Sequence, residues 1–183
     1  MFDSVIYVTF QELATRISHR NTGKACNEPI ADQLLGKISA DENLHMIFYR
    51  DVSEAGFEID PNRATKSLHK ILRNFQMPGF QVPEFRRKAV FIAVGGVYDP
   101  RIHLDEVVMP VLKKWRFFER EDITGEAAAL REDLALLIKE LEVACDKFEV
   151  SKQRQLDREA RTGKKVTAYE LHKTAGKLAM SMR

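Results

Sequence analysis

The strongest constraint on the fold is a helical stripe between Ile38 and Val52 that carries two polar residues. Positions 38, 42, 45, 49 and 52 follow the 4-3-4-3 spacing of a buried helix face, and Glu42 and His45 fall on that face. A carboxylate and an imidazole one turn apart inside a core are costly unless they pair or bind a metal ion. The pattern therefore leaves two interpretations open, a hydrogen-bonded or salt-bridged pair, or metal ligands.

A second helix with the same anomaly favours the metal interpretation. Residues Asp3 to Arg20 are apolar over most of a predicted helix, and Glu12 lies on one of its apolar stripes. At about 1.5 Å per residue, Glu12 lies about 16 Å before a turn predicted at Gly23 to Pro29, and Glu42 lies about 20 Å beyond that turn. Two antiparallel helices would thus bring Glu12 close to the level of Glu42 and His45.

Carboxylates and an imidazole that converge inside a helical bundle are typical of di-iron carboxylate proteins. The complete site takes one Glu from each of two helices and a Glu-x-x-His from each of the other two. We therefore predict Glu12, Glu42 and His45 as metal ligands, which is half of the set for two Fe(2+) ions. Other histidines fit less well, since the His103-to-Glu106 segment reverses the ligand order and is predicted at the surface. His19 is predicted as a polar residue at the bundle end.

The remaining sequence predicts helices throughout. Helix starts are indicated at Asp60-Pro61, Pro83, Asp99-Pro100 and Thr124, with Asn27 as a cap before Pro29 and an interruption at Pro110. The longest periodic stretch follows Thr124 and has apolar residues at Leu130, Leu134, Leu137, Leu141, Cys145 and Phe148. No strand alternation is seen, so the fold class is all-α. Residues 1–150 are predicted to form the bundle, and 151–183 a basic extension with a short helix near residues 167–170.

Composition excludes few functions for this chain. A length of 183 residues with 44% hydrophobic residues fits one domain. The longest apolar run is too short to span a bilayer, and no secretory signal is recognised. Cys26 and Cys145 give no disulfide framework; both are predicted as packing residues, and a reduced cytoplasmic location is expected.

The net charge of +2 conceals an asymmetry along the chain. Residues 151–183 contain nine Lys or Arg and three Asp or Glu, hence +6, which leaves −4 for the first 150. Such a basic tail suits nucleic acid, an anionic membrane or an acidic protein, or it is simply solvated.

Two segments resemble the downstream iron motifs of the soluble acyl-[acyl-carrier-protein] desaturases. They are Q-E-L-A-T-R-I-S-H-R-N-T-G (Gln11 to Gly23) and A-D-E-N-L-H (Ala40 to His45). F-Q-M-P-G-F-Q-V-P-E-F-R-R-K-A (Phe75 to Ala89) and Y-D-P-R-I-H-L-D-E-V-V-M-P-V-L-K-K-W (Tyr98 to Trp115) look like mycobacterial-type members. The resemblance covers essentially the whole chain and implies a ferritin-like di-iron helical bundle. It matches the C-terminal part of that domain, so the upstream ligand helices have no counterpart here.

The resemblance also implies a role for each residue of the two motifs. Glu42 corresponds to a carboxylate that bridges the irons, His45 to a terminal nitrogen ligand and Glu12 to a terminal carboxylate ligand. Thr15 corresponds to a catalytic threonine beside the oxygen-binding position. Asp41 corresponds to an acid that hydrogen-bonds a ligand histidine, and that histidine belongs to the upstream motif.

The activity implied by the resemblance is the O₂-dependent introduction of a double bond into a fatty acyl chain held on acyl carrier protein. A ferredoxin-type protein would supply electrons, and a homodimer is expected, with no nucleic-acid partner. The acidic carrier could dock on Arg86-Arg87-Lys88 or Lys113-Lys114, although these can equally be solvated helix faces. The alternative is a catalytically silent truncated fragment or interaction module with an incomplete metal site.

Overall fold

The computed structural model describes residues 1–77 and 80–163, apart from the side chains of Arg86 and Arg87. Its elements are α1 (Phe2–Cys26), α2 (Pro29–Ile59), α3 (Pro61–Arg73), α4 (Phe85–Val94), α5 (Pro100–Ile102), the π-helix η1 (His103–Val108), α6 (Met109–Lys114), the 3-10 helix η2 (Phe117–Glu119) and α7 (Gly125–Thr162). No strand occurs in this part of the chain, which confirms the all-α prediction. None of its helices has the length and apolarity needed to cross a bilayer. The helix predicted near residues 167–170 lies outside the described residues.

The helices α1 and α2 form an antiparallel hairpin with a shorter turn than the sequence predicted. Asn27, in the left-handed conformation with φ 49°, ends α1, and the Glu28 carboxylate accepts hydrogen bonds from the first main-chain N–H groups of α2. The prediction that Asn27 caps α2 was therefore wrong. Gly23 lies inside α1 and is buried. A Cβ at this position would lie 3.2 Å from the Leu35 Cβ on α2, so the two helices leave little room for a side chain. Close approach of the two helices, and not a turn, explains this glycine.

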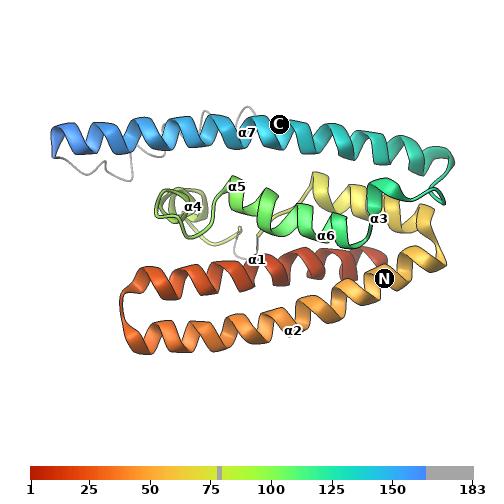
Figure 1. The fold of residues 1–183 in the computed structure, drawn as a ribbon, viewed down its shortest axis with the longest axis horizontal. Coiled ribbons are helices and arrows are strands. Elements are labelled where there is room, and N and C mark those ends of the chain that lie inside the picture. Colours follow the sequence, from red (N-terminus) through yellow and green to blue (C-terminus); the bar gives the residue numbers. More distant parts are fainter. Residues whose placement is uncertain (78–79, 164–183) are drawn as a thin grey trace.

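The hairpin forms one edge of the molecule and α7 forms the opposite edge, with the shorter helices between them (Figure 1). The Asp60 carboxylate accepts a hydrogen bond from the Arg63 N–H at 3.0 Å, so α3 begins at the predicted position. The Asp99 carboxylate caps α5 in the same way, and helix geometry changes from π to α beside Pro110. Helix α7 runs unbroken through position 150, the boundary predicted between the bundle and its basic extension.

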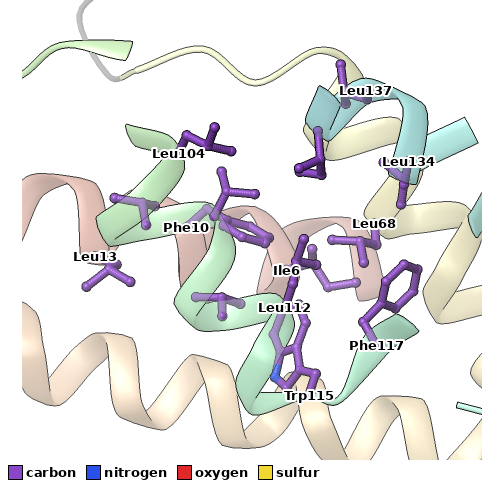
Figure 2. Packing of buried hydrophobic residues seen from close by; sticks show 14 of the residues in the cluster. Ile6, Phe10, Leu13, Leu68, Leu104, Leu112, Trp115, Phe117, Leu134 and Leu137 are labelled. Atoms are coloured by element: carbon purple, nitrogen blue, oxygen red, sulfur yellow. The ribbon is translucent and has the colours of Figure 1, made fainter. Parts of the chain in front are cut away.

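Aromatic packing ties the central helices to the hairpin (Figure 2). Trp115 is buried, its ring meets Phe10 edge-on at 5.8 Å, and its Nε1 donates to the Arg50 carbonyl oxygen of α2 at 3.1 Å. Phe57 packs on the same indole ring at 5.3 Å. One residue following α6 thus fixes the positions of both α1 and α2.

The buried face of α2 differs from the predicted one. Its buried residues are Ser39, Met46, Ser53, Gly56 and Phe57. Because α1 packs against this face, the stripe predicted from Ile38 to Val52 lies at the edge of the helix contact. The Ser39 hydroxyl donates to the Arg16 carbonyl oxygen of α1 at 2.9 Å, which marks the true line of contact. Val52 is 39% exposed.

Two further predictions about single residues were wrong. His103, expected at the surface, is half-buried, stacks on Phe75 at 4.9 Å and shares a 2.7 Å hydrogen bond with the Tyr98 hydroxyl. Cys26, expected in packing, is exposed at the end of α1, whereas Cys145 is buried as predicted.

Candidate metal centre

Three predicted ligands converge in the middle of the α1–α2 hairpin. Glu12 comes from α1, Glu42 and His45 come from α2, and one ligand atom from each lies within 4.8 Å of the other two. The His45 Nδ1 is 3.4 Å from Glu12 Oε2 and 3.7 Å from Glu42 Oε2. The sequence predicted that these residues converge, because Glu12 and Glu42 lie at similar distances along their helices from the turn that joins them.

The cluster is enclosed on the glutamate side and open on the histidine side. The side chains of Glu12 and Glu42 are 14% and 19% exposed, whereas that of His45 is 60% exposed. The two carboxylates therefore lie between the helices, and the imidazole forms the outer wall of the cluster.

Burial and like charge oppose ionisation of Glu12. Burial, together with hydrogen bonding and charge repulsion from Glu42, raises the pKa of the Glu12 carboxyl to about 7 from 4.5, and His45 counteracts only part of this. Glu12 Oε2 is buried and has no hydrogen-bond partner within the described part of the chain. A buried oxygen without a donor is costly, and a cation that the cluster binds would remove that cost.

The donor set fits iron. Carboxylate and imidazole are the ligands of carboxylate-rich di-iron sites, and the two types are present here in the expected ratio. Within residues 1–77 and 80–163, this is the one cluster of at least three His, Cys, Asp or Glu side chains placed to share an ion.

His19, predicted as a polar residue at the bundle end, lies beside the cluster. Its Nε2 lies 3.7 Å from Glu42 Oε1, while Glu42 Oε2 faces His45 at the same distance. The two oxygens of Glu42 thus each face an imidazole. The signal was present in the sequence, because His19 follows Glu12 by seven residues and so shares its helix face.

The two predicted catalytic residues lie outside the converging ligand set. The Thr15 hydroxyl donates to the carbonyl oxygens of Gln11 and Glu12, at 3.1 and 3.0 Å, within its own helix. The Asp41 side chain is exposed on α2 and makes no hydrogen bond within the described residues. Their roles remain predictions.

Other predicted or possible binding features lie apart from the cluster. A pocket lined by Tyr7 and residues 76–77 and 80–83 opens on α1, but at about 100° per residue Tyr7 points to the opposite side of that helix from Glu12. Lys114 is held by Glu54 at 3.0 Å, and neighbouring Lys113 is exposed.

Comparison with known proteins decides the family. The sequence profile described as "Fatty acid desaturase" matches residues 1–167, nearly the whole chain. The chain belongs to the fatty acid desaturase family. Together with the helices described above, this membership confirms the all-α, ferritin-like fold.

Named relatives within the family agree with the profile. The chain is 84% identical over 181 residues to the "Putative acyl-[acyl-carrier-protein] desaturase DesA1" of Mycobacterium tuberculosis, covering 99% of this chain and 54% of that protein. It is 30% identical over 154 residues to the "Stearoyl-[acyl-carrier-protein] 9-desaturase 6, chloroplastic" of Arabidopsis thaliana, covering 77% of this chain and 39% of the plant protein. The chain thus spans about half the length, or less, of the curated relatives that it matches.

Proposed function

We propose that this chain is part of an acyl-[acyl-carrier-protein] desaturase and carries one half of its di-iron site. The observation that supports this most directly is the convergence of Glu12, Glu42 and His45 within 4.8 Å from two antiparallel helices. The two relatives are named as acyl-[acyl-carrier-protein] desaturases, and these names suggest the substrate class. The reaction would introduce a double bond into a carrier-bound fatty acyl chain, as in fatty acid biosynthesis.

In this proposal the three clustered residues hold iron. Glu12 and His45 would serve as terminal ligands, and Glu42, whose two oxygens face different imidazoles, would serve as the bridging carboxylate. Iron, when bound, supplies the activation of O₂ and the removal of hydrogens from an unactivated chain, which side chains alone do not perform. The work of this chain is to hold the ligands in place and to exclude water on the Glu12 side of the cluster.

Thr15 and Asp41 have supporting roles in the proposal. Thr15 follows Glu12 by one turn of the same helix, so a change of rotamer would turn its hydroxyl from the helix carbonyls toward the cluster. Asp41 would orient a ligand histidine of the upstream motif, which has no counterpart in this chain; its exposed side chain, with no hydrogen bond within the described residues, agrees with that role.

Partners follow from the reaction class. The substrate is an acyl chain on acyl carrier protein, an acidic protein that Lys113 and the neighbouring basic residues would attract. A ferredoxin-type donor would supply electrons, and a cytoplasmic homodimer is the proposed setting.

The alternative is a catalytically silent helical module. It is favoured by one observation, the three ligands of the cluster where a di-iron site has six. Iron analysis separates the two hypotheses, because a silent module binds at most weak, substoichiometric iron and consumes no O₂ under any reconstitution.

The proposed function is tested by complementation. The chain is co-expressed with the part of the M. tuberculosis relative that it does not cover, and the complex is supplied with reductant, O₂ and an acyl-carrier substrate. We expect iron binding and desaturation, and we expect Glu42→Ala to abolish both. Lys37→Ala, at an exposed position on the same helix, is the control and keeps full activity. Normal turnover and iron content in the Glu42→Ala complex would refute the assignment of the site.

A further inference from the structure

The contact between α1 and α2 follows a seven-residue repeat on both helices. The repeating positions, which we call the α1–α2 seam, are Thr9, Arg16 and Gly23 on α1 and Ser39, Met46 and Ser53 on α2. All of them except Arg16 are buried. A seven-residue repeat keeps the same faces of two long helices in contact over many turns. The seam is unusual in that three of its buried side chains carry a hydroxyl group.

These hydroxyls join the two helices at two levels of the seam. The Ser39 hydroxyl donates to the Arg16 carbonyl oxygen at 2.9 Å. The Thr9 hydroxyl donates to the Val5 carbonyl oxygen of its own helix at 2.9 Å, which uses its one hydrogen. Its oxygen therefore accepts from the Ser53 hydroxyl, 3.3 Å away. Each of the two serines thus donates one hydrogen bond from α2 to α1.

The two hydrogen bonds lie on either side of the metal cluster. On α1 the bonded positions fall four residues after Glu12 and three residues before it. On α2 they fall three residues before Glu42 and eight residues after His45. At about 1.5 Å per residue, each bonded position lies within about 12 Å of a ligand residue along its helix. The three ligand side chains are therefore enclosed between two points at which the helices are joined.

Pairing of the buried hydroxyls favours one register of the two helices. A slide of α1 along α2 by one residue would move each donor about 1.5 Å relative to its acceptor and would leave buried hydroxyls without partners. The apolar contacts of Met46 tolerate such a slide better, because they have no direction. Polar residues in a helix contact specify its register for this reason. The same slide would separate the ligand side chains, whose geometry must be held within about 0.5 Å to bind a metal ion.

The hairpin turn fixes the register at one end of the helices. Ser39 lies 11 residues beyond Glu28, about 16 Å along α2, whereas Ser53 lies 25 residues beyond it, about 38 Å. The Ser39 bond therefore reinforces the end that the turn already holds. The bond between Thr9 and Ser53 holds the far end, where the turn has the least influence. The far bond is thus the more sensitive position for a test.

We propose that the hydroxyls of Thr9, Ser39 and Ser53 are positioning groups, whose hydrogen bonds across the seam hold the register in which the three ligand side chains converge. They act through the two helices and not as ligands. The inference concerns the hairpin before any metal is bound, and it rests on the proposed function only for its prediction about iron.

Two nearly isosteric substitutions separate positioning from general stability. Thr9→Val and Thr65→Val each remove the hydroxyl of a fully buried threonine that donates to a carbonyl oxygen of its own helix. We therefore expect similar decreases in the free energy of unfolding in urea. Thr65 lies on α3, outside the seam, and is the matched control. Thr9→Ser keeps the hydroxyl and should restore the register and the iron affinity of the natural chain.

The first test measures the register without metal, in the complex of this chain with the part of the M. tuberculosis relative that it does not cover. With Cys26 replaced by Ser, spin labels are attached to cysteines placed at Ser4 and Ala55, exposed positions on α1 and α2. We expect Thr9→Val to shift or broaden the distribution of distances between the two labels, and Thr65→Val to leave it unchanged. Identical distributions in the natural and Thr9→Val complexes would overturn the proposal.

The second test is anaerobic titration of the same complexes with ferrous iron. We expect Thr9→Val to raise the iron dissociation constant at least about tenfold, the lower end of what residues supporting metal ligands contribute. Ser39→Ala should act in the same direction and more weakly, and Thr65→Val should have no effect. Adding Ser53→Ala to Thr9→Val should weaken binding no further, because the two hydroxyls form one bond. Equal affinities in the two valine variants, or additive losses in the double variant, would contradict the inference.

The two tests also distinguish this inference from the proposed function. If the natural complex binds no iron but Thr9→Val changes the label distances, the inference about register stands and the di-iron assignment fails. If the complex desaturates its substrate and Glu42→Ala abolishes this, while Thr9→Val changes neither label distances nor iron affinity, the proposed function stands and the inference is overturned.

Discussion

Replacing Glu12 by glutamine should stabilise the metal-free chain at alkaline pH. The pKa of Glu12 is raised from 4.5 to about 7, chiefly by burial and then by Glu42. Between these two pH values the folded chain keeps a proton that the unfolded chain releases, so the free energy of unfolding falls as pH rises. A difference of about 2.5 in pKa corresponds to about 3 kcal/mol. A glutamine side chain at this position would have nearly the same shape and no proton to lose.

The assay is urea unfolding in the presence of chelator at pH 4.5 and pH 8. We expect Glu12→Gln to match the natural chain at pH 4.5 and to exceed it by up to about 3 kcal/mol at pH 8. Glu121→Gln, at an exposed position, is the control and should change neither value. With ferrous iron at pH 8 the order should reverse, because only the natural chain gains binding energy. An equal loss of stability with pH in both chains would refute the argument from burial.

Three further predictions concern the scaffold. Trp115→Ala should lower the free energy of unfolding by about 3–5 kcal/mol in a thermal unfolding experiment, because it leaves a cavity among aromatic rings and a carbonyl oxygen without its donor. Phe118→Ala, at a 40% exposed site, is the control and should cost far less. Burial lowers the pKa of His103 to about 4, so the natural chain should lose stability relative to His103→Gln as pH falls from about 6.5 to about 4; an unchanged difference would contradict this. Arg120→Met should cost about 1–3 kcal/mol in urea unfolding, because the 11% exposed guanidinium binds two carboxylates and a carbonyl oxygen, while Arg116→Met at a 78% exposed site should be neutral.

The sequence alone predicted most helix starts and the three residues that converge in the candidate metal centre. Asp60 and Asp99 start helices because a side-chain oxygen satisfies N–H groups two or three residues ahead, and such contacts need nothing from the rest of the chain. The sequence predicted the proximity of Glu12, Glu42 and His45, because the helix rise per residue is constant and one hairpin joins their two helices. The family motifs pointed to the same three residues.

Only the tertiary structure decided which faces are covered. Helical periodicity places Glu42 and His45 on one stripe, but α1 packs against the neighbouring stripe of Met46, so His45 is left at the surface. His103 was missed for the same reason, since its burial comes from a tyrosine and a phenylalanine that the fold brings to it. The sequence predicted a turn at Gly23, whereas in the structure the close approach of α2 explains why this position has no side chain. Capping and helical periodicity fix where a helix begins and which residues share a face. Whether a face is buried depends on the elements that pack against the helix, and contacts between residues distant in sequence decide which elements those are.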